Sequence, residues 1–118
     1  MKTILVVDDE LGSAEVLSLI LEEEGYRALC AVNGRQALVQ ARDVVPDLVI
    51  VDYMMPLMNG ADFARELRAD TQFADTKIIL NSGLPEAAIR EHFGGYDAFL
   101  RKPYGIDDAL RVIARLLG

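Results

Sequence analysis

Short apolar runs alternate with segments of helical periodicity along the whole chain. Apolar runs typical of strands occupy residues 2–7, 27–32, 48–51, 77–81 and 98–101. Between and after them, apolar side chains recur three or four positions apart, which predicts helices over 12–24, 34–42, 62–70, 85–92 and 106–117. Such a succession of strand–helix units predicts an α/β fold, a doubly wound parallel sheet of five strands with about five helices on its two faces.

The first helical segment has a polar and an apolar face. We expect its polar stripe to face solvent, and this stripe consists of Glu15, Ser18 and Glu22. The apolar residues Val16 and Ile20 lie opposite and are expected to pack on the sheet.

Three local signals refine these boundaries. Gly25 is placed to end the first helix, because glycine enters the left-handed conformation at little cost. Asn33-Gly34 is also a favoured pair for a hairpin turn, but the residues after it have helical periodicity, so we interpret Asn33 as the approach to a helix. The run 48–51 is uniformly apolar, which suits a parallel strand covered on both faces.

Length and composition indicate one globular domain, residues 1–118, because single domains commonly hold about 100–200 residues. A hydrophobic fraction of 52% excludes a disordered chain. No apolar run approaches the roughly 18 residues of a membrane span, so we expect no membrane insertion. The first residues lack the basic stretch of a secretory signal, and the single Cys30 excludes a disulfide framework, so we expect a cytoplasmic protein.

The chain is acidic, with a formal net charge of −7. Direct nucleic-acid binding requires a basic face, so this charge argues against it. The charge identifies no partner by itself, because acidic surfaces are common.

Chemically capable side chains follow four of the five predicted strands. Asp8 and Asp9 follow the first, Asp52 the third, Ser82 the fourth and Lys102 the fifth. In a flavodoxin-like strand order 2-1-3-4-5, the first and third strands flank the point where ligands bind. The three carboxylates would then converge, and their repulsion calls for a cation. Mg²⁺ is the natural choice, because it takes hard oxygen ligands and keeps water that a phosphate can displace.

These residues would suffice for phosphoryl chemistry. An aspartate carboxylate can attack phosphorus and form an acyl phosphate. Lys102 would place a positive charge on the phosphoryl oxygens, and the Ser82 hydroxyl would donate a hydrogen bond to one of them. Taken singly, each residue has an ordinary explanation, since an aspartate after a strand often caps the next helix. Their joint occurrence at matching strand ends favours a functional site.

Four segments, VVDDE, VDYMMPLMNG, ILNSG and AFLRKPY, resemble the receiver domain of two-component response regulators. The resemblance extends over essentially the whole chain and is most specific at 52–60 and at Lys102-Pro103. It implies that Asp52 is the phosphoacceptor and also one of the Mg²⁺ ligands. It further implies that Asp9 binds Mg²⁺ directly, that Asp8 binds it mostly through water, and that the Met54 backbone carbonyl completes the protein ligands. The remaining family positions are the hydroxyl switch Ser82, the aromatic switch Phe99 and the invariant lysine Lys102.

The resemblance also implies partners. The donor would be a phosphohistidine on a sensor histidine kinase or on a histidine phosphotransfer protein in a phosphorelay. A downstream protein would contact the face formed by the predicted helix 85–92, strand 98–101 and helix 106–117. The domain would be a monomer or a weak, phosphorylation-dependent dimer. It would be no enzyme, since it would catalyse only its own phosphorylation and dephosphorylation.

Some positions depart from the family pattern. Gly83 stands where a small alanine is usual, and Tyr96 replaces a usual small residue. The stretch between Ser82 and Lys102, which contains the helix 85–92, is slightly short. Met54 and Leu84 occupy the positions that flank the approach of a hydrolytic water in the family, and both are apolar.

Two other functions use similar residues. A Mg²⁺-dependent phosphatase with an aspartate nucleophile needs a second aspartate two positions later, and Met54 stands there. A binding-only pseudo-receiver would have no need of the full residue set. The sequence fits a stand-alone regulator and, equally, a fragment of a longer regulator or hybrid kinase.

Overall fold

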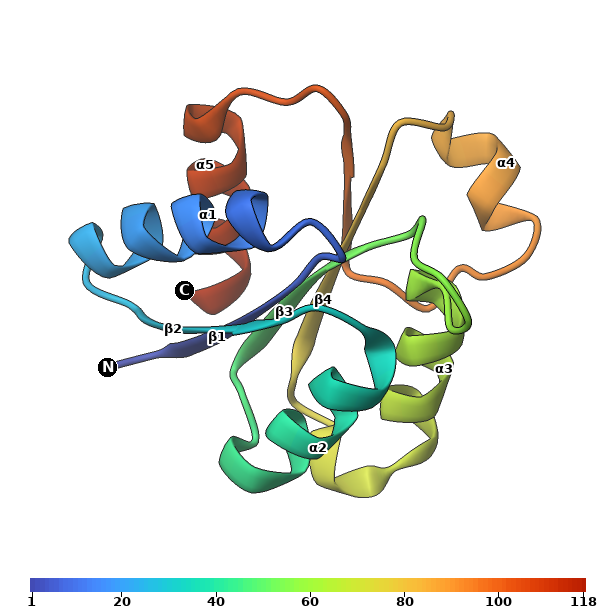
Figure 1. The fold of residues 1–118 in the computed structure, drawn as a ribbon, viewed down its shortest axis with the longest axis horizontal. Coiled ribbons are helices and arrows are strands. Elements are labelled where there is room, and N and C mark those ends of the chain that lie inside the picture. Colours follow the sequence, from blue (N-terminus) through green and yellow to red (C-terminus); the bar gives the residue numbers. More distant parts are fainter.

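The computed structural model describes all residues from Met1 to Gly118 and consists of a parallel sheet between two helical layers (Figure 1). The strands are β1 (Thr3–Val7), β2 (Arg27–Ala31), β3 (Leu48–Asp52), β4 (Lys77–Ser82) and β5 (Ala98–Arg101). They lie in the order β2-β1-β3-β4-β5, and every neighbouring pair is parallel. The predicted doubly wound topology is therefore confirmed.

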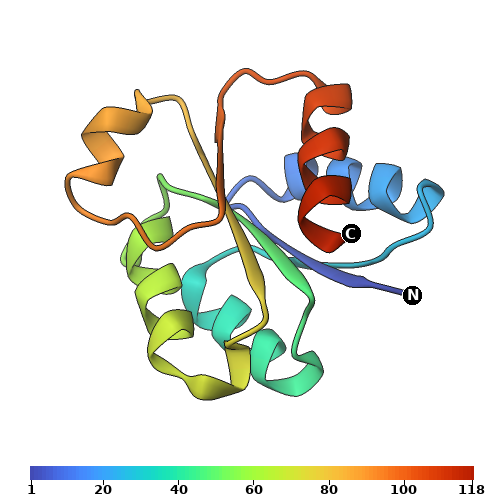
Figure 2. The same ribbon diagram turned by 180° about the vertical axis from the view of Figure 1, so that it is seen from behind.

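Helices cover both faces of this sheet. They are α1 (Leu11–Glu23), α2 (Gly34–Val44), α3 (Gly60–Ala69), α4 (Glu86–Arg90) and α5 (Ile106–Leu117), with a short 3₁₀ turn at Thr71–Phe73. Figures 1 and 2 show α1 and α5 together on one side of the sheet and α2 and α3 on the other. No helix is both long and apolar enough to cross a membrane.

Each face has its own hydrophobic core, because alternate strand residues point to opposite sides. Ile4 and Ile50 pack with α1 and α5, whereas Leu5 and Val51 pack with α2 and α3. All five residues of the central strand β3 are buried, as its uniformly apolar sequence predicts.

Local signals set several helix ends. Asn33 is the N-cap of α2, and its side chain accepts a hydrogen bond from the Gln36 amide at 2.8 Å. Asn59 and Asp62 form a capping box at the start of α3. Gly25 follows α1 with φ at 94°, the left-handed conformation expected of it.

The predicted faces of the first helix are wrong. Ser18 is buried and forms a hydrogen bond with Cys30 on β2, whereas Val16 is 58% exposed. The helix instead packs through Ala14, Leu17 and Leu21, which recur at the helical period. Apolar residues occur on every side of this helix, so its periodicity identified the helix but not its orientation.

The fourth helix is shorter than the predicted 85–92. It ends at Arg90, and residues 91–97 form an irregular connection to β5. Arg68 on α3 holds this connection, since its guanidinium donates to the Gly95 carbonyl at 3.1 Å and to the Asp97 carboxylate at 2.6 Å. These long-range contacts, which periodicity does not encode, compete with a further helical turn.

Candidate functional site

Three carboxylates meet at the carboxyl edge of the sheet. Asp8 follows β1, Asp52 ends β3, and Asp9 lies beside them. One carboxylate oxygen from each lies within 4.8 Å of the others. The structure therefore brings together the three aspartates that the strand order predicts to converge.

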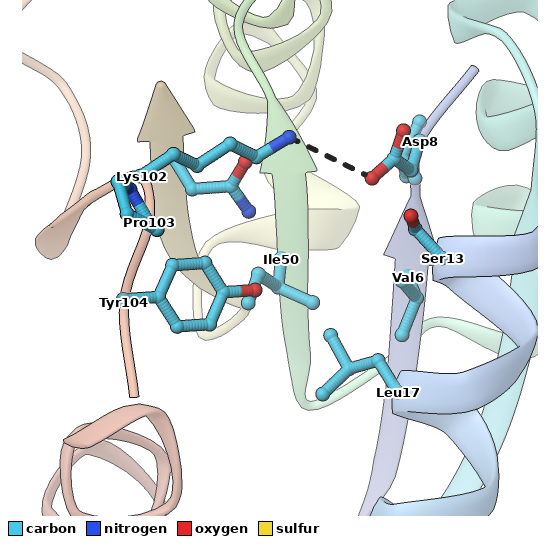
Figure 3. Close-up of a pocket in the computed structure, with 10 residues that line it drawn as sticks. Val6, Asp8, Ser13, Leu17, Ile50, Lys102, Pro103 and Tyr104 are labelled. Atoms are coloured by element: carbon cyan, nitrogen blue, oxygen red, sulfur yellow. Dashed lines mark ion pairs between the residues drawn. The ribbon is translucent and has the colours of Figure 1, made fainter. Parts of the chain in front are cut away.

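Lys102 reaches this group from the end of β5. Its ammonium lies 3.2 Å from Asp52 Oδ2 and 3.8 Å from Asp8 Oδ2, and Figure 3 shows the contact with Asp8. The Lys102 amide donates to the Ser82 carbonyl at 2.8 Å, so main-chain pairing between β4 and β5 continues to the lysine itself. The sheet thus fixes the position from which the ammonium extends.

The site is electrostatically strained. Burial raises the pKa of Asp8, and repulsion from Asp52 and Asp9 adds to this effect. A hydrogen bond from the Glu10 amide to Asp8 Oδ1, at 2.9 Å, and the charge of Lys102 act in the opposite direction without cancelling it. Burial lowers the pKa of Lys102, but the attraction of Asp52 and Asp8 outweighs it and the pKa is raised. One ammonium therefore faces three carboxylates.

This donor set fits a hard divalent cation. The carboxylate oxygens offer the ligand chemistry that Mg²⁺ prefers, and Asp9 is exposed to the solvent from which an ion arrives. Burial is the largest cause of the raised pKa of Asp8, and a divalent cation would offset the smaller contribution from repulsion by Asp52 and Asp9.

The loop after Asp52 is packed closely against the strand end. The Tyr53 amide donates to the Asn81 carbonyl at 2.8 Å, and the Gly60 amide donates to the Tyr53 carbonyl at 2.9 Å. A Cβ at Gly60 would lie 2.6 Å from the Asp52 carbonyl oxygen, so only glycine lets α3 begin here. This close approach fixes the loop that carries Met54.

The other predicted site residues differ in exposure. Ser82 is completely buried, and its hydroxyl oxygen accepts a hydrogen bond from the Leu84 amide at 3.0 Å. Phe99 is half-buried, with its ring 6.0 Å from that of Tyr96. Met54 exposes 61% of its surface, so its side chain lies largely in solvent.

Sequence reasoning missed two polar residues beside this site. Asn81 is buried at the end of β4, and Tyr104 lies two positions after Lys102. Burial raises the pKa of Tyr104. The signal for Asn81 was present, since an amide interrupts an otherwise apolar strand of sequence KIILN.

Comparison with known proteins identifies the family of the chain. The family model described as response regulator receiver domain matches residues 4–114. The DNA-binding response regulator MtrA of Mycobacterium tuberculosis is 37% identical over 114 residues, which cover 96% of this chain and 50% of MtrA. PhoB of Pseudomonas aeruginosa, a phosphate regulon transcriptional regulatory protein, is 37% identical over 105 residues, covering 87% of this chain and 46% of PhoB. The chain spans about half the length of these relatives.

Solved structures agree with this match. Chemotaxis protein CheY4 of Vibrio cholerae superposes with a TM-score of 0.92 at 29% identity and covers 99% of both chains. Response regulator TrrA of Thermotoga maritima, solved in complex with Mg(2+)-BeF, has a TM-score of 0.86 at 35% identity. The superposition with TrrA covers 99% of this chain and 100% of that one.

Proposed function

The chain belongs to the receiver domain family of two-component response regulators, which act as phosphorylation-switched signalling domains, and from this premise we propose that Asp52 is its phosphoacceptor. The observation that carries the proposal is the placement of Asp52 between the Lys102 ammonium, at 3.2 Å, and the carboxylates of Asp8 and Asp9. An aspartate so placed has a cationic group on one side and ligands for a second cation on the other.

The transfer forms one bond and breaks one. An Asp52 carboxylate oxygen attacks phosphorus, and the phosphorus–nitrogen bond of a donor phosphohistidine breaks, leaving the electron pair on the imidazole. Mg²⁺ would be held by Asp8, Asp9, Asp52 and the Met54 backbone carbonyl, and it would neutralise charge on the phosphoryl oxygens. Lys102 donates to one of these oxygens and the Ser82 hydroxyl to another.

The product is a signal rather than a released compound. We propose that the new contact with Ser82 alters the β4–α4 connection and the packing of Phe99, so that the face formed by α4, β5 and α5 changes for a downstream protein. Phosphorylation can shift the equilibrium between the two conformations only by the difference in the free energy of the contacts that the phosphoryl group makes in each. We assign the donor to a sensor histidine kinase or a histidine phosphotransfer protein, and the domain to a monomer or weak phosphorylation-dependent dimer.

We propose a cytoplasmic location on the same grounds, supported by the free thiol of Cys30. Turnover of external phosphoesters is not part of the proposal. The residue two positions after Asp52 is Met54, whose side chain offers no proton to a leaving group.

Labelling with acetyl phosphate tests the assignment. Wild-type protein with Mg²⁺ is expected to gain one phosphoryl group by intact-mass analysis, and Asp52→Asn is expected to gain none. Asp75→Asn is the matched control, because the same change is made at an exposed carboxylate. Wild-type labelling of Asp52→Asn would overturn the assignment.

Metal binding is tested by titration of the unphosphorylated protein. Asp9→Ala is expected to lose most of the Mg²⁺ affinity, because it removes a carboxylate from the cluster. Glu10→Ala removes the neighbouring carboxylate, which lies outside the cluster, and is expected to retain it. Equal losses in the two variants would contradict the assigned ligands.

A further inference from the structure

Tyr96 lies in the connection between α4 and β5, and the backbone on either side of it is anchored. Arg68 on α3 donates to the Gly95 carbonyl and to the Asp97 carboxylate. The same carboxylate accepts a hydrogen bond from the Ile78 amide of β4 at 2.7 Å. Figures 1 and 2 show this connection running beside α3 before it enters β5. The backbone of Tyr96 is therefore a fixed point from which its side chain extends.

The Tyr96 hydroxyl is bound to both ends of α4. It donates to Glu86 Oε2 at 2.7 Å and accepts from Arg90 Nε at 3.2 Å. Glu86 and Arg90 also form an ion pair at 2.6 Å, so the three side chains contact one another. Hydrogen bonds to an ionised partner are stronger than those between neutral groups. Because Ile89 is the only buried residue of α4, this cluster of three side chains is a main attachment of the helix.

The ring of Tyr96 contacts the aromatic residue of β5. Its centroid lies 6.0 Å from that of Phe99, and the two rings are tilted by 49°, an arrangement in which aromatic pairs attract. Phe99 therefore supports the orientation of the ring from which the hydroxyl reaches Glu86. A displacement of Phe99 would remove this support, and the Tyr96 side chain could then turn about its anchored backbone.

We propose that Tyr96 is a positioning residue that holds α4 while Phe99 occupies the place it has in this structure, and that releases the helix when Phe99 moves. The hold rests on the contacts of Tyr96 with Glu86 and Arg90. The release rests in addition on the proposed function, in which phosphorylation of Asp52 alters the packing of Phe99. Phosphorylation thereby increases the mobility of α4, since the helix then loses one of its few attachments.

Amide hydrogen exchange over residues 86–93 tests the hold. Tyr96→Phe keeps the ring beside Phe99 and removes only the hydroxyl. Without phosphorylation, this variant is expected to exchange about five to ten times faster than wild type over these residues, as for the loss of a hydrogen bond to a charged group. Equal exchange in the two proteins would overturn the hold.

A second pair of variants tests the acceptor of the hydroxyl. Glu86→Gln removes the charge of the acceptor and is expected to accelerate exchange in the same direction but by less, since the amide oxygen can still accept. Glu91→Gln is the matched control, because it makes the same change at an exposed glutamate next to α4 that does not contact Tyr96. Equal acceleration in both variants would show that the lost charge, not the contact with Tyr96, is responsible, and would overturn the assigned partner.

Addition of Mg²⁺ and beryllium fluoride, which mimics a phosphoryl group on an aspartate, tests the release. In wild type it is expected to accelerate exchange over residues 86–93 about five to ten times. Tyr96→Phe is expected to show little further acceleration, because the hydroxyl that holds α4 is already absent. If Tyr96 only stabilised the fold, the mimic would change the exchange rate by the same factor in both proteins, and that result would overturn the release.

Amide resonances of β5 distinguish failure of this proposal from failure of the proposed function. The mimic is expected to shift residues 98–101 in wild type and in Tyr96→Phe alike, because the variant keeps the ring beside Phe99. Absence of these shifts in wild type would overturn the proposed change at Phe99 and the release with it. Exchange measured without the mimic would still decide whether Tyr96 holds α4.

Discussion

Neutralising Asp8 is expected to stabilise the unliganded domain, although it removes a charged partner of Lys102. In Asp8→Asn the side chain keeps its shape, and its oxygen can still accept the hydrogen bond from the Glu10 amide. The change removes the cost of burying the Asp8 charge, which is the largest cause of its raised pKa. It also removes two repulsions, with Asp52 and Asp9, and one attraction, with Lys102. The sign of the effect depends on which of these is larger.

The distances decide the sign. The carboxylate oxygens lie within 4.8 Å of one another. At an effective dielectric constant of about 20, two charges at that upper limit interact by about 3 kcal/mol, and at the 3.8 Å between Lys102 and Asp8 by about 4 kcal/mol. Two repulsions therefore exceed one attraction by about 2 kcal/mol. Asp9 is exposed and Lys102 is 36% exposed, so solvent screening reduces the net gain to about 1 kcal/mol. For a domain of this size, that gain raises Tm by about 4 °C.

The assay is thermal unfolding at low ionic strength and neutral pH, in EDTA and then in saturating Mg²⁺. Without metal, Asp8→Asn is expected to have a higher Tm than wild type. The control Asp75→Asn, at an exposed site, is expected to have the same Tm as wild type. In Mg²⁺ at about 100 times its Kd, wild type gains about 2.7 kcal/mol, and the order is expected to reverse if the variant binds the ion poorly. A variant that melts below wild type in EDTA would refute the electrostatic reasoning.

The dependence on pH provides an independent check. The pKa of Asp8 is raised in the folded state, so the folded protein takes up a proton there more readily than the unfolded chain does. The destabilisation caused by ionised Asp8 is therefore present above that raised pKa and disappears as the pH falls through it. The difference in Tm between Asp8→Asn and wild type is expected to shrink over the same interval.

Two further predictions concern the phosphorylated state. Ser82→Ala is expected to accept phosphate from acetyl phosphate but to show smaller amide resonance changes at residues 84–108 than wild type, because the hydroxyl that would report the phosphoryl group is missing; full-sized changes would contradict the role of Ser82. Met54 and Leu84, which are 61% and 43% exposed, cannot orient a water by hydrogen bonding. At fixed Mg²⁺, the phosphoryl group on Asp52 of wild type is therefore expected to decay more slowly, by a factor of about ten or more, than that of the double variant Met54→Asn, Leu84→Glu. Equal decay would show that these side chains do not govern hydrolysis.

The sequence predicted the features that depend on strand order. It did not predict the features that depend on contacts between segments distant in the chain. Asp8, Asp9 and Asp52 were expected to converge, because parallel strands with this topology end at one edge of the sheet. The burial of Ser18 was not foreseen, because it depends on how α1 is rotated against Cys30 on β2. The early end of α4 was not foreseen either, because Arg68 reaches the following connection from another helix.

Asn81 was overlooked for a different reason, because its amide was visible in the sequence but was not given a role. Its position at the end of β4 places it next to Ser82, so from the sequence it reads only as part of the strand that delivers the hydroxyl. Adjacent strand residues point to opposite faces, and Ser82 and Asn81 therefore serve different surroundings. Asn81 lies among residues of the α1 and α5 face, beside Lys102 and Tyr104. One strand end thus supplies Ser82 to the proposed phosphoacceptor site and Asn81 to the opposite face of the sheet, and only the fold shows what surrounds each of them.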